Sequence, residues 1–309
     1  MRKTGIKTIA ESFKRVENRI INLSRKGFKQ IRESTLNQIK GNPDIIDTQA
    51  LANAFYIGLL SGYIHGKMTM VGELLSKKKK KQFAEEWSDY REIFAVFMRD
   101  KDLIMKLVRK KYTAEEAMKM FFKPNQFILD YFKEYSVKLA NIEAEDTLKK
   151  ASELVSKTIE EGMSEREAIK YIANNLQDFS KKRIKAIART EATRGYNIGA
   201  LEESYTSNIV KGYQFEAILD KRTSKICISR WGMYIDKNDK AKLARNTPPL
   251  HVNCRSFLRT VTIYDNEFPV KKENIPADNL EFLQKIDNIP KPQTRDYDVN
   301  ILMEILNRL

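Results

Sequence analysis

The chain has 309 residues, of which 42% are hydrophobic and 31% are charged, with 56 lysines and arginines against 41 aspartates and glutamates. The net charge of +15 exceeds what solubility requires and favours a polyanionic partner such as nucleic acid over a merely solvated surface. Two cysteines argue against a disulfide-stapled secreted protein, and no uncharged run is long enough to span a bilayer, so we expect no membrane partner.

Residues 1–123 are predicted to form a basic, helical N-terminal region. Apolar residues recur at helical spacing from Ile6 to Ile20, and a second long helix is expected over residues 47–76. Its His65 has no histidine or cysteine nearby and is interpreted as a structural residue. Aromatic residues between Phe83 and Lys111 again follow helical spacing and are interpreted as core, and Thr113 is expected to cap a further helix.

A run of five lysines follows the second helix. Like charges repel one another, so the run is either a flexible, solvated join or a patch that contacts DNA phosphates or another partner. The basic face of the first helix has the same two interpretations: it is exposed to solvent, or it docks to DNA or to an acidic protein surface. The candidate DNA- or partner-binding residues in the run are Lys77, Lys78, Lys79, Lys80 and Lys81.

Residues 124–265 are predicted to form a second unit, in which helices precede a small β-sheet. One helix is expected from Pro124 to about Glu161, with Gly162 as its stop, and another opens at the capping box Ser164-Glu165-Arg166-Glu167. A further helix is predicted over residues 181–203. Alternation predicts a strand over residues 211–220, a second over 257–263 and a short third over 233–235.

The fold class is therefore expected to be α+β, with a predominantly helical N-terminal body and a small β-containing module towards the C-terminus. Residues 266–309 are predicted to be a proline-containing tail that ends in a short helix near residues 298–308.

The scarce metal-capable side chains of the chain fall within one segment of about thirty residues. They are Cys227, His251 and Cys254, and the His-x-x-Cys spacing allows two of them to converge on one ion at a tight turn. Zinc is one interpretation. The other is a buried thiol pair beside a histidine that hydrogen-bonds the backbone, because no fourth zinc ligand is evident and no other cofactor is indicated.

Catalysis by the same residues lacks supporting features. The Cys–His pair has no evident orienting third group or oxyanion hole, and no carboxylate pair accompanies the histidine at ligand spacing. We therefore expect no enzymatic activity and assign no catalytic residue. The alternative is a metal-dependent nuclease, or another DNA-processing enzyme, that uses His251.

Three motifs in a fixed order carry a family resemblance. They are Ala188-Arg189-Thr190-Glu191, Asp220-Lys221-Arg222-Thr223 and Pro248-Pro249-Leu250-His251-Val252-Asn253-Cys254-Arg255. Together they resemble the phage Mu F-like minor head proteins, also called phage head morphogenesis proteins, over about residues 125–263. The resemblance implies a structural protein of a tailed phage or prophage that associates with the portal and acts in head assembly or in handling DNA.

The motif residues that the resemblance carries over are interpreted as a structural cluster. They are Arg189, Thr190, Glu191, Asp220, Arg222, His251, Asn253, Cys254 and Arg255. Members of the family often have a second cysteine in each cluster, where this chain has Ser224 and Ser256. If the fuller set binds a metal, we expect this chain to have lost that site and to keep the fold by packing and hydrogen bonds.

The charged members of the cluster suggest how the module is held. We expect complementary charges on the helix, the strand end and the loop to pin the helix to the β-module through charge-assisted hydrogen bonds. The candidate side chains are Arg189, Glu191, Asp220, Arg222 and Arg255.

The function expected from the sequence is that of a minor head protein acting in head assembly and in DNA packaging or ejection. Its expected partners are the portal protein, double-stranded DNA bound without sequence preference, and other capsid or scaffold proteins. The expected location is the virion, in the head interior or at the portal vertex, and the host cytoplasm during assembly.

Overall fold

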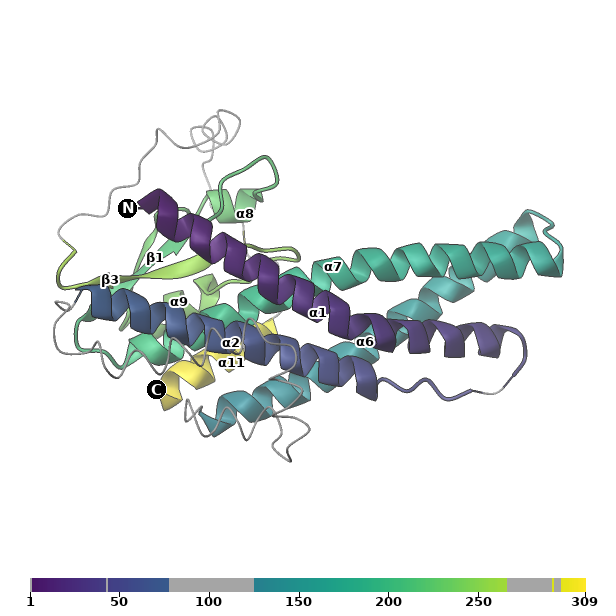
Figure 1. The fold of residues 1–309 in the computed structure, drawn as a ribbon, viewed down its shortest axis with the longest axis horizontal. Coiled ribbons are helices and arrows are strands. Elements are labelled where there is room, and N and C mark those ends of the chain that lie inside the picture. The colour runs from purple at the N-terminus through teal and green to yellow at the C-terminus, as the bar shows by residue number, and fades with distance from the viewer. Residues whose placement is uncertain (1, 43, 78–124, 266–290, 292–295) are drawn as a thin grey trace.

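The computed structural model describes residues 2–42, 44–77, 125–265, 291 and 296–309. Four long helices run side by side along the long axis: α1 (Arg2–Ile39), α2 (Gln49–Lys77), α6 (Gln126–Glu160) and α7 (Glu165–Tyr205) (Figure 1). A small sheet and short helices gather at the end where α1 begins. The α+β class expected from the sequence is confirmed.

The ends of the long helices follow local sequence signals. Ser164 and Glu167 form the predicted capping box at the start of α7, and Asn125 caps the start of α6 by accepting a hydrogen bond from the N–H of Phe127. Gly162, with φ of 63°, follows the end of α6 in the left-handed region that favours glycine. The separate helix predicted over residues 181–203 is wrong, because no proline interrupts α7 between residues 165 and 205.

Helices α2 and α7 touch backbone to backbone. Gly62 and Gly66 on α2 face Gly195 and Gly199 on α7, and each pair is four residues apart, which puts both glycines on one face of their helix. A Cβ atom at Gly66 or Gly199 would overlap a carbonyl oxygen of the opposite helix. Glycine is therefore required here by space, and the contact fixes where α7 lies.

The cores of the body and of the module are continuous around these helices. One buried cluster joins α1, α2, α6 and α7 through residues such as Ile20, Phe55 and Ala188. A second joins Tyr63 and Phe132 of the body to the sheet and to the C-terminal helix. The division of the chain at residues 123 and 265 remains a prediction.

The sheet has three antiparallel strands in the order β2-β1-β3. They are β1 (Val210–Glu216), β2 (Tyr234–Asp236) and β3 (Phe257–Thr262), and Tyr213 at the centre pairs with Ile235 on one side and Thr260 on the other. The predicted positions of all three strands are confirmed, but β1 ends at Glu216 rather than at residue 220. The residues after it form the loop that leads to the Asp220 motif, where Asp220 accepts from the N–H of Arg222.

Short helices that the sequence analysis did not predict complete the module. They are α8 (Lys225–Ile228) and α9 (Lys240–Asn246), capped by the side chains of Ser224 and Asp239. The predicted terminal helix is confirmed as α11 (Asp296–Arg308), whose Leu302, Ile305 and Leu306 are buried in the core. Among the described residues, no helix is long and apolar enough to cross a membrane.

Candidate functional site

A tight turn at residues 251–254 presents His251 and Cys254 from the same loop. The N–H of Cys254 donates to the carbonyl of His251 at 3.2 Å, which closes the turn. Asn253 has φ of 65°, a left-handed conformation that asparagine tolerates better than most residues. The turn therefore points Cys254 into the core, where it is fully buried, and leaves His251 half-buried.

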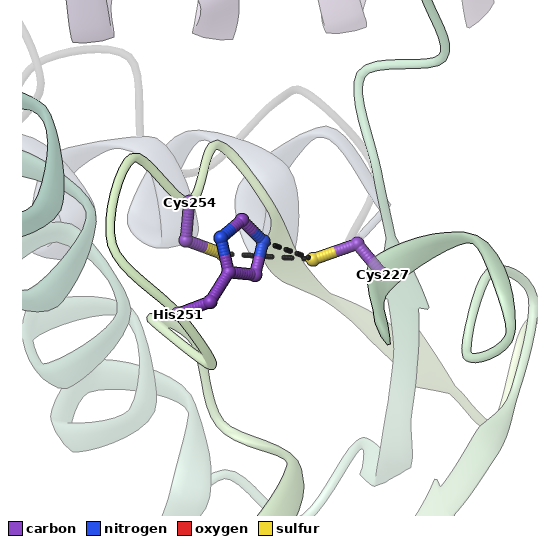
Figure 2. A group of neighbouring side chains, drawn as sticks. All are labelled: Cys227, His251 and Cys254. Atoms are coloured by element: carbon purple, nitrogen blue, oxygen red, sulfur yellow. Dashed lines mark hydrogen bonds between the residues drawn. The ribbon is translucent and has the colours of Figure 1, made fainter. Parts of the chain in front are cut away.

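Helix α8 brings Cys227 to the same point. Ser224 caps this helix by accepting from the N–H of Cys227 at 3.2 Å, which orients the single helical turn that carries the cysteine. The Cys227 Sγ atom then lies 3.1 Å from the His251 Nε2 atom and 3.7 Å from the Cys254 Sγ atom. Figure 2 shows the three side chains pointing toward one another. The three donor atoms all lie within 4.8 Å of one another.

The positions where the family often has further cysteines lie beside this cluster. The Ser224 hydroxyl is 2.7 Å from the His251 Nε2 atom, and the Ser256 hydroxyl hydrogen-bonds Cys227. Both serines thus contact the cluster directly. The second histidine, His65, is buried elsewhere with its ring centroid 5.4 Å from that of Tyr196, and burial lowers its pKa to about 4.

The two thiols differ sharply in their tendency to ionise. Burial opposes ionisation of Cys254, but its hydrogen bonds with Cys227 and His251 outweigh burial, so the pKa of Cys254 lies well below its ordinary value. The contact with Cys254, together with burial, raises the pKa of Cys227. Burial lowers the pKa of His251, yet Cys254 and the Val252 carbonyl outweigh it and raise that pKa. The cluster thus favours one thiolate beside a histidine.

Neutral side chains on α7 hold the turn in place. Thr190 accepts from the N–H of Asn253 at 3.0 Å, and the Thr193 hydroxyl donates to the Cys254 carbonyl at 2.7 Å. The Asn197 amide donates to the Ser256 carbonyl at 3.2 Å and accepts from the N–H of Leu258 at 3.0 Å. Thr193 and Asn197 were missed by the sequence analysis.

The missed residues had a recognisable spacing. Residues 190, 193 and 197 are three and four positions apart and so share one face of a helix. Each side chain bonds a backbone group between residues 253 and 258. A stripe of neutral polar residues along one face of this helix was therefore the signal that could have found them.

Asp220 and Arg255, two of the charged residues singled out in the sequence, link the loop after β1 to the turn. Two nitrogens of Arg255 reach the two carboxylate oxygens of Asp220 at 2.7 and 2.6 Å, a paired geometry that favours this partner. The hydrogen bond from Arg255 lowers the pKa of Asp220 well below its ordinary value, with the backbone N–H of Arg222 acting in the same direction against burial. The Arg222 guanidinium is exposed and contacts Asp220 only at 3.4 Å.

The remaining charges do not pin the helix to the module as expected. Arg189 pairs with Glu17 of α1 at 2.8 Å and reaches the turn only through Asn253 at 3.4 Å. Glu191 is buried and pairs with Arg194 of its own helix at 2.8 Å, while the Tyr135 hydroxyl of α6 donates to it at 3.1 Å. The charge-pinning hypothesis is therefore wrong for these two residues, because nearer partners neutralise them within the helical body.

Only the first residue of the lysine run is among the described residues. Lys77 is the last residue of α2, and Lys78, Lys79, Lys80 and Lys81 lie outside the described residues. The aromatic segment between Phe83 and Lys111 and the helix start at Thr113 also lie outside them. These interpretations stay predictions.

Comparison with known proteins supports the resemblance in the motifs. The model of the family described as Phage Mu protein F like protein matches residues 149–259, from the second half of α6 through β3. The resemblance to phage head morphogenesis proteins is confirmed for this part of the chain. No curated protein and no solved structure matches the chain significantly.

Proposed function

We propose that this protein is a minor head protein of a tailed phage or prophage, which associates with the portal and acts in head assembly and in DNA packaging or ejection. The observation that carries the proposal is the family match over residues 149–259. That segment contains the turn, its attachments on α7 and the Asp220–Arg255 pair. The proposed role is structural, with the virion as the site of action and the host cytoplasm as the site of assembly.

A portal partner is tested with proteins from the same phage or prophage. We expect the full chain to co-purify with the portal protein after co-expression, and to be present in purified heads. Charge reversal of the exposed Arg222 serves as a first map of the contact surface. The proposal is contradicted if the portal protein does not bind this chain and purified heads do not contain it.

Non-specific binding of double-stranded DNA is the second part of the proposal. Exposed basic side chains lie at the same level on α1 and α7. Glu17 pairs with Arg189 near one end of this antiparallel pair, and Leu36 packs near the other end against the cluster that contains Ile172 and Leu176. These basic residues are Arg25, Lys26 and Lys29 on α1 and Lys181, Lys182 and Lys185 on α7. Such a surface suits phosphate contacts without base readout.

The DNA proposal predicts strong salt dependence. If the protein neutralises several phosphates, affinity for duplexes of unrelated sequence should fall about a thousandfold between roughly 50 and 200 mM salt. The double variant Arg25→Glu, Lys26→Glu should bind DNA at least about tenfold more weakly at low salt. The control Lys211→Glu, Lys242→Glu makes the same charge change on exposed residues of the module. Equal losses in both variants would argue against a binding surface on α1.

The nuclease alternative receives no support from the described residues. The carboxylates of the motif, Asp220 and Glu191, are both held by arginines, and the donors beside His251 are thiols. We expect purified protein to leave supercoiled plasmid intact in the presence of divalent metals. Nicking that disappears in His251→Ala would replace the structural proposal with an enzymatic one.

A further inference from the structure

The geometry of the turn and α8 points to a metal site, and we propose that Cys227, His251 and Cys254 bind one zinc ion. The three donor atoms come from α8 and from the turn at residues 251–254, and they lie within 4.8 Å of one another. They are two sulfurs and one imidazole nitrogen, a soft donor set that selects zinc over calcium or magnesium. This inference stands independently of the role in head assembly, and it replaces the expectation from the sequence that Ser224 and Ser256 mark a lost metal site.

The separation of the two sulfurs already fits a shared ion. Two thiolates about 2.3 Å from a tetrahedral zinc lie about 3.8 Å apart. The Cys227 and Cys254 Sγ atoms are 3.7 Å apart. A disulfide would instead require the two atoms to approach to about 2.0 Å. The distance therefore corresponds to two ligands of one ion more closely than to a cystine.

The histidine is oriented as a ligand. Its Nδ1 atom lies 2.7 Å from the Val252 carbonyl, which can only accept, so Nδ1 carries the proton and Nε2 is left with a lone pair toward the sulfurs. Metal-bound histidines commonly donate their second ring N–H to a carbonyl in this way. The Nε2–Cys227 distance of 3.1 Å must open to about 3.6 Å, a small rotation for a half-buried ring on a turn.

Burial makes two thiolates at this point dependent on a counter-charge. Both cysteines are buried, with exposed fractions of 2% for Cys227 and 0% for Cys254, so two thiolates would repel strongly without a cation between them. A divalent ion neutralises them while keeping both out of water.

The fourth position falls on the side of Ser224. Its hydroxyl lies 2.7 Å from the His251 Nε2 atom, and both residues are half-buried, whereas the two cysteines close the inner side. Because hydroxyls are weak zinc ligands, we assign this position to a water molecule hydrogen-bonded to Ser224. The ion would cross-link α8 to the turn, which α7 already holds through Thr193.

Metal analysis of the full-length protein tests the proposal directly. Protein purified without chelator should contain about one zinc ion per chain. Cobalt exchanged into it should give the intense near-ultraviolet thiolate-to-cobalt band together with the visible bands of a tetrahedral site. Metal-free protein with two freely titratable thiols, or protein with a Cys227–Cys254 disulfide and no bound metal, overturns the proposal.

Variants locate the site and separate ligation from folding. Cys227→Ser and His251→Ala should lower zinc content at least about tenfold, in line with the loss of one of three ligands. Thr147→Val is the matched control, because it removes a buried hydroxyl that bonds the Glu143 carbonyl within α6 and leaves the turn and its donor atoms unchanged, so it should retain the full zinc content. If a ligand variant fails to fold, the cobalt spectrum of the parent chain still decides. Zinc retained at the parental level by both ligand variants places the ion elsewhere.

Discussion

Helix α7 is held on two sides by interactions of opposite character. Against α2, Gly195 and Gly199 allow backbone to meet backbone, and the contact depends on the absence of side chains. Against the Cys254 turn, Thr193 and Asn197 reach out and bond backbone groups of the loop. The first contact tolerates no added volume, and the second tolerates no lost hydrogen-bonding atom.

The difference shows how α7 packs against the helical body on one side and holds the β-containing module on the other. Close helix packing fixes the position of α7 rigidly, since carbonyl oxygens of α2 leave no room for adjustment. The turn has little regular structure of its own, and its orientation comes from specific acceptors and donors. We therefore expect stability to be dominated by the glycine contact and the geometry of the site by the polar contact.

The largest expected effect comes from adding one methyl group at the glycine contact. Gly199→Ala should lower the free energy of unfolding by at least about 3 kcal/mol, the upper range for overpacking, because the new Cβ meets the Tyr63 carbonyl oxygen. Gly58→Ala is the comparison, since its Cβ would meet the buried side chain of Ile20 rather than a backbone carbonyl, so a smaller loss is expected there. Chemical denaturation measures both. Equal, small losses would mean that the helices can separate freely.

The next effect tests the polar side of α7. Asn197→Ala leaves the Leu258 N–H and the Ser256 carbonyl without this partner in a buried site, and should cost roughly 2–3 kcal/mol. Asn175→Ala is the control on the same helix, because among the described residues the Asn175 amide donates to the Tyr171 carbonyl, four residues earlier on α7 itself. Comparable denaturation midpoints for the two variants would show that Asn197 does not attach β3.

Much of the fold could be predicted from local patterns. Helical spacing and the Ser164 capping box located α2, α6 and the start of α7, and alternation located the strands. The continuity of α7 was missed because the basic residues 181–183 are of the kind favoured at the end of a helix, although no glycine or proline follows them to end one. Helices α8 and α9 were missed because helices of four and seven residues show too little periodicity to recognise and are fixed by capping side chains such as Ser224.

The sequence predicted which residues form the site better than it predicted which residues they contact. The scarcity of cysteine and histidine drew attention to Cys227, His251 and Cys254, which the structure brings together. The attachment to α7 was wrongly ascribed to Arg189 and Glu191, since charges attract notice in a sequence. Their actual partners, Glu17 and Arg194, are set by tertiary packing, and a sequence offers several equivalent candidates for each.

A smaller effect isolates one hydrogen bond at the turn. Thr193→Val keeps the shape of the side chain but removes the donor to the buried Cys254 carbonyl, and should cost roughly 1–2 kcal/mol. Thr147→Val is the matched control, a buried threonine whose hydroxyl bonds only the Glu143 carbonyl of its own helix. Its loss should stay below about 1 kcal/mol. If Thr147→Val lowered the free energy of unfolding more than Thr193→Val, the Thr193 hydroxyl would not be what attaches the turn to α7.

The smallest effect is the pH dependence of the Asp220–Arg255 pair. Arg255 lowers the folded-state pKa of Asp220, so the pair stabilises the fold above the unfolded pKa of about 3.9, and this contribution is lost as pH falls below it. Because the Asp220 side chain is 35% exposed, solvent screening limits the contribution to about 1 kcal/mol or less. The stability difference between the parent chain and Asp220→Asn should therefore be constant near neutral pH and shrink below about pH 4. Both proteins are measured with chelator present, so that metal release makes no contribution. A difference that grows as pH falls would mean that the carboxylate is destabilised in the folded state, against the paired geometry with Arg255.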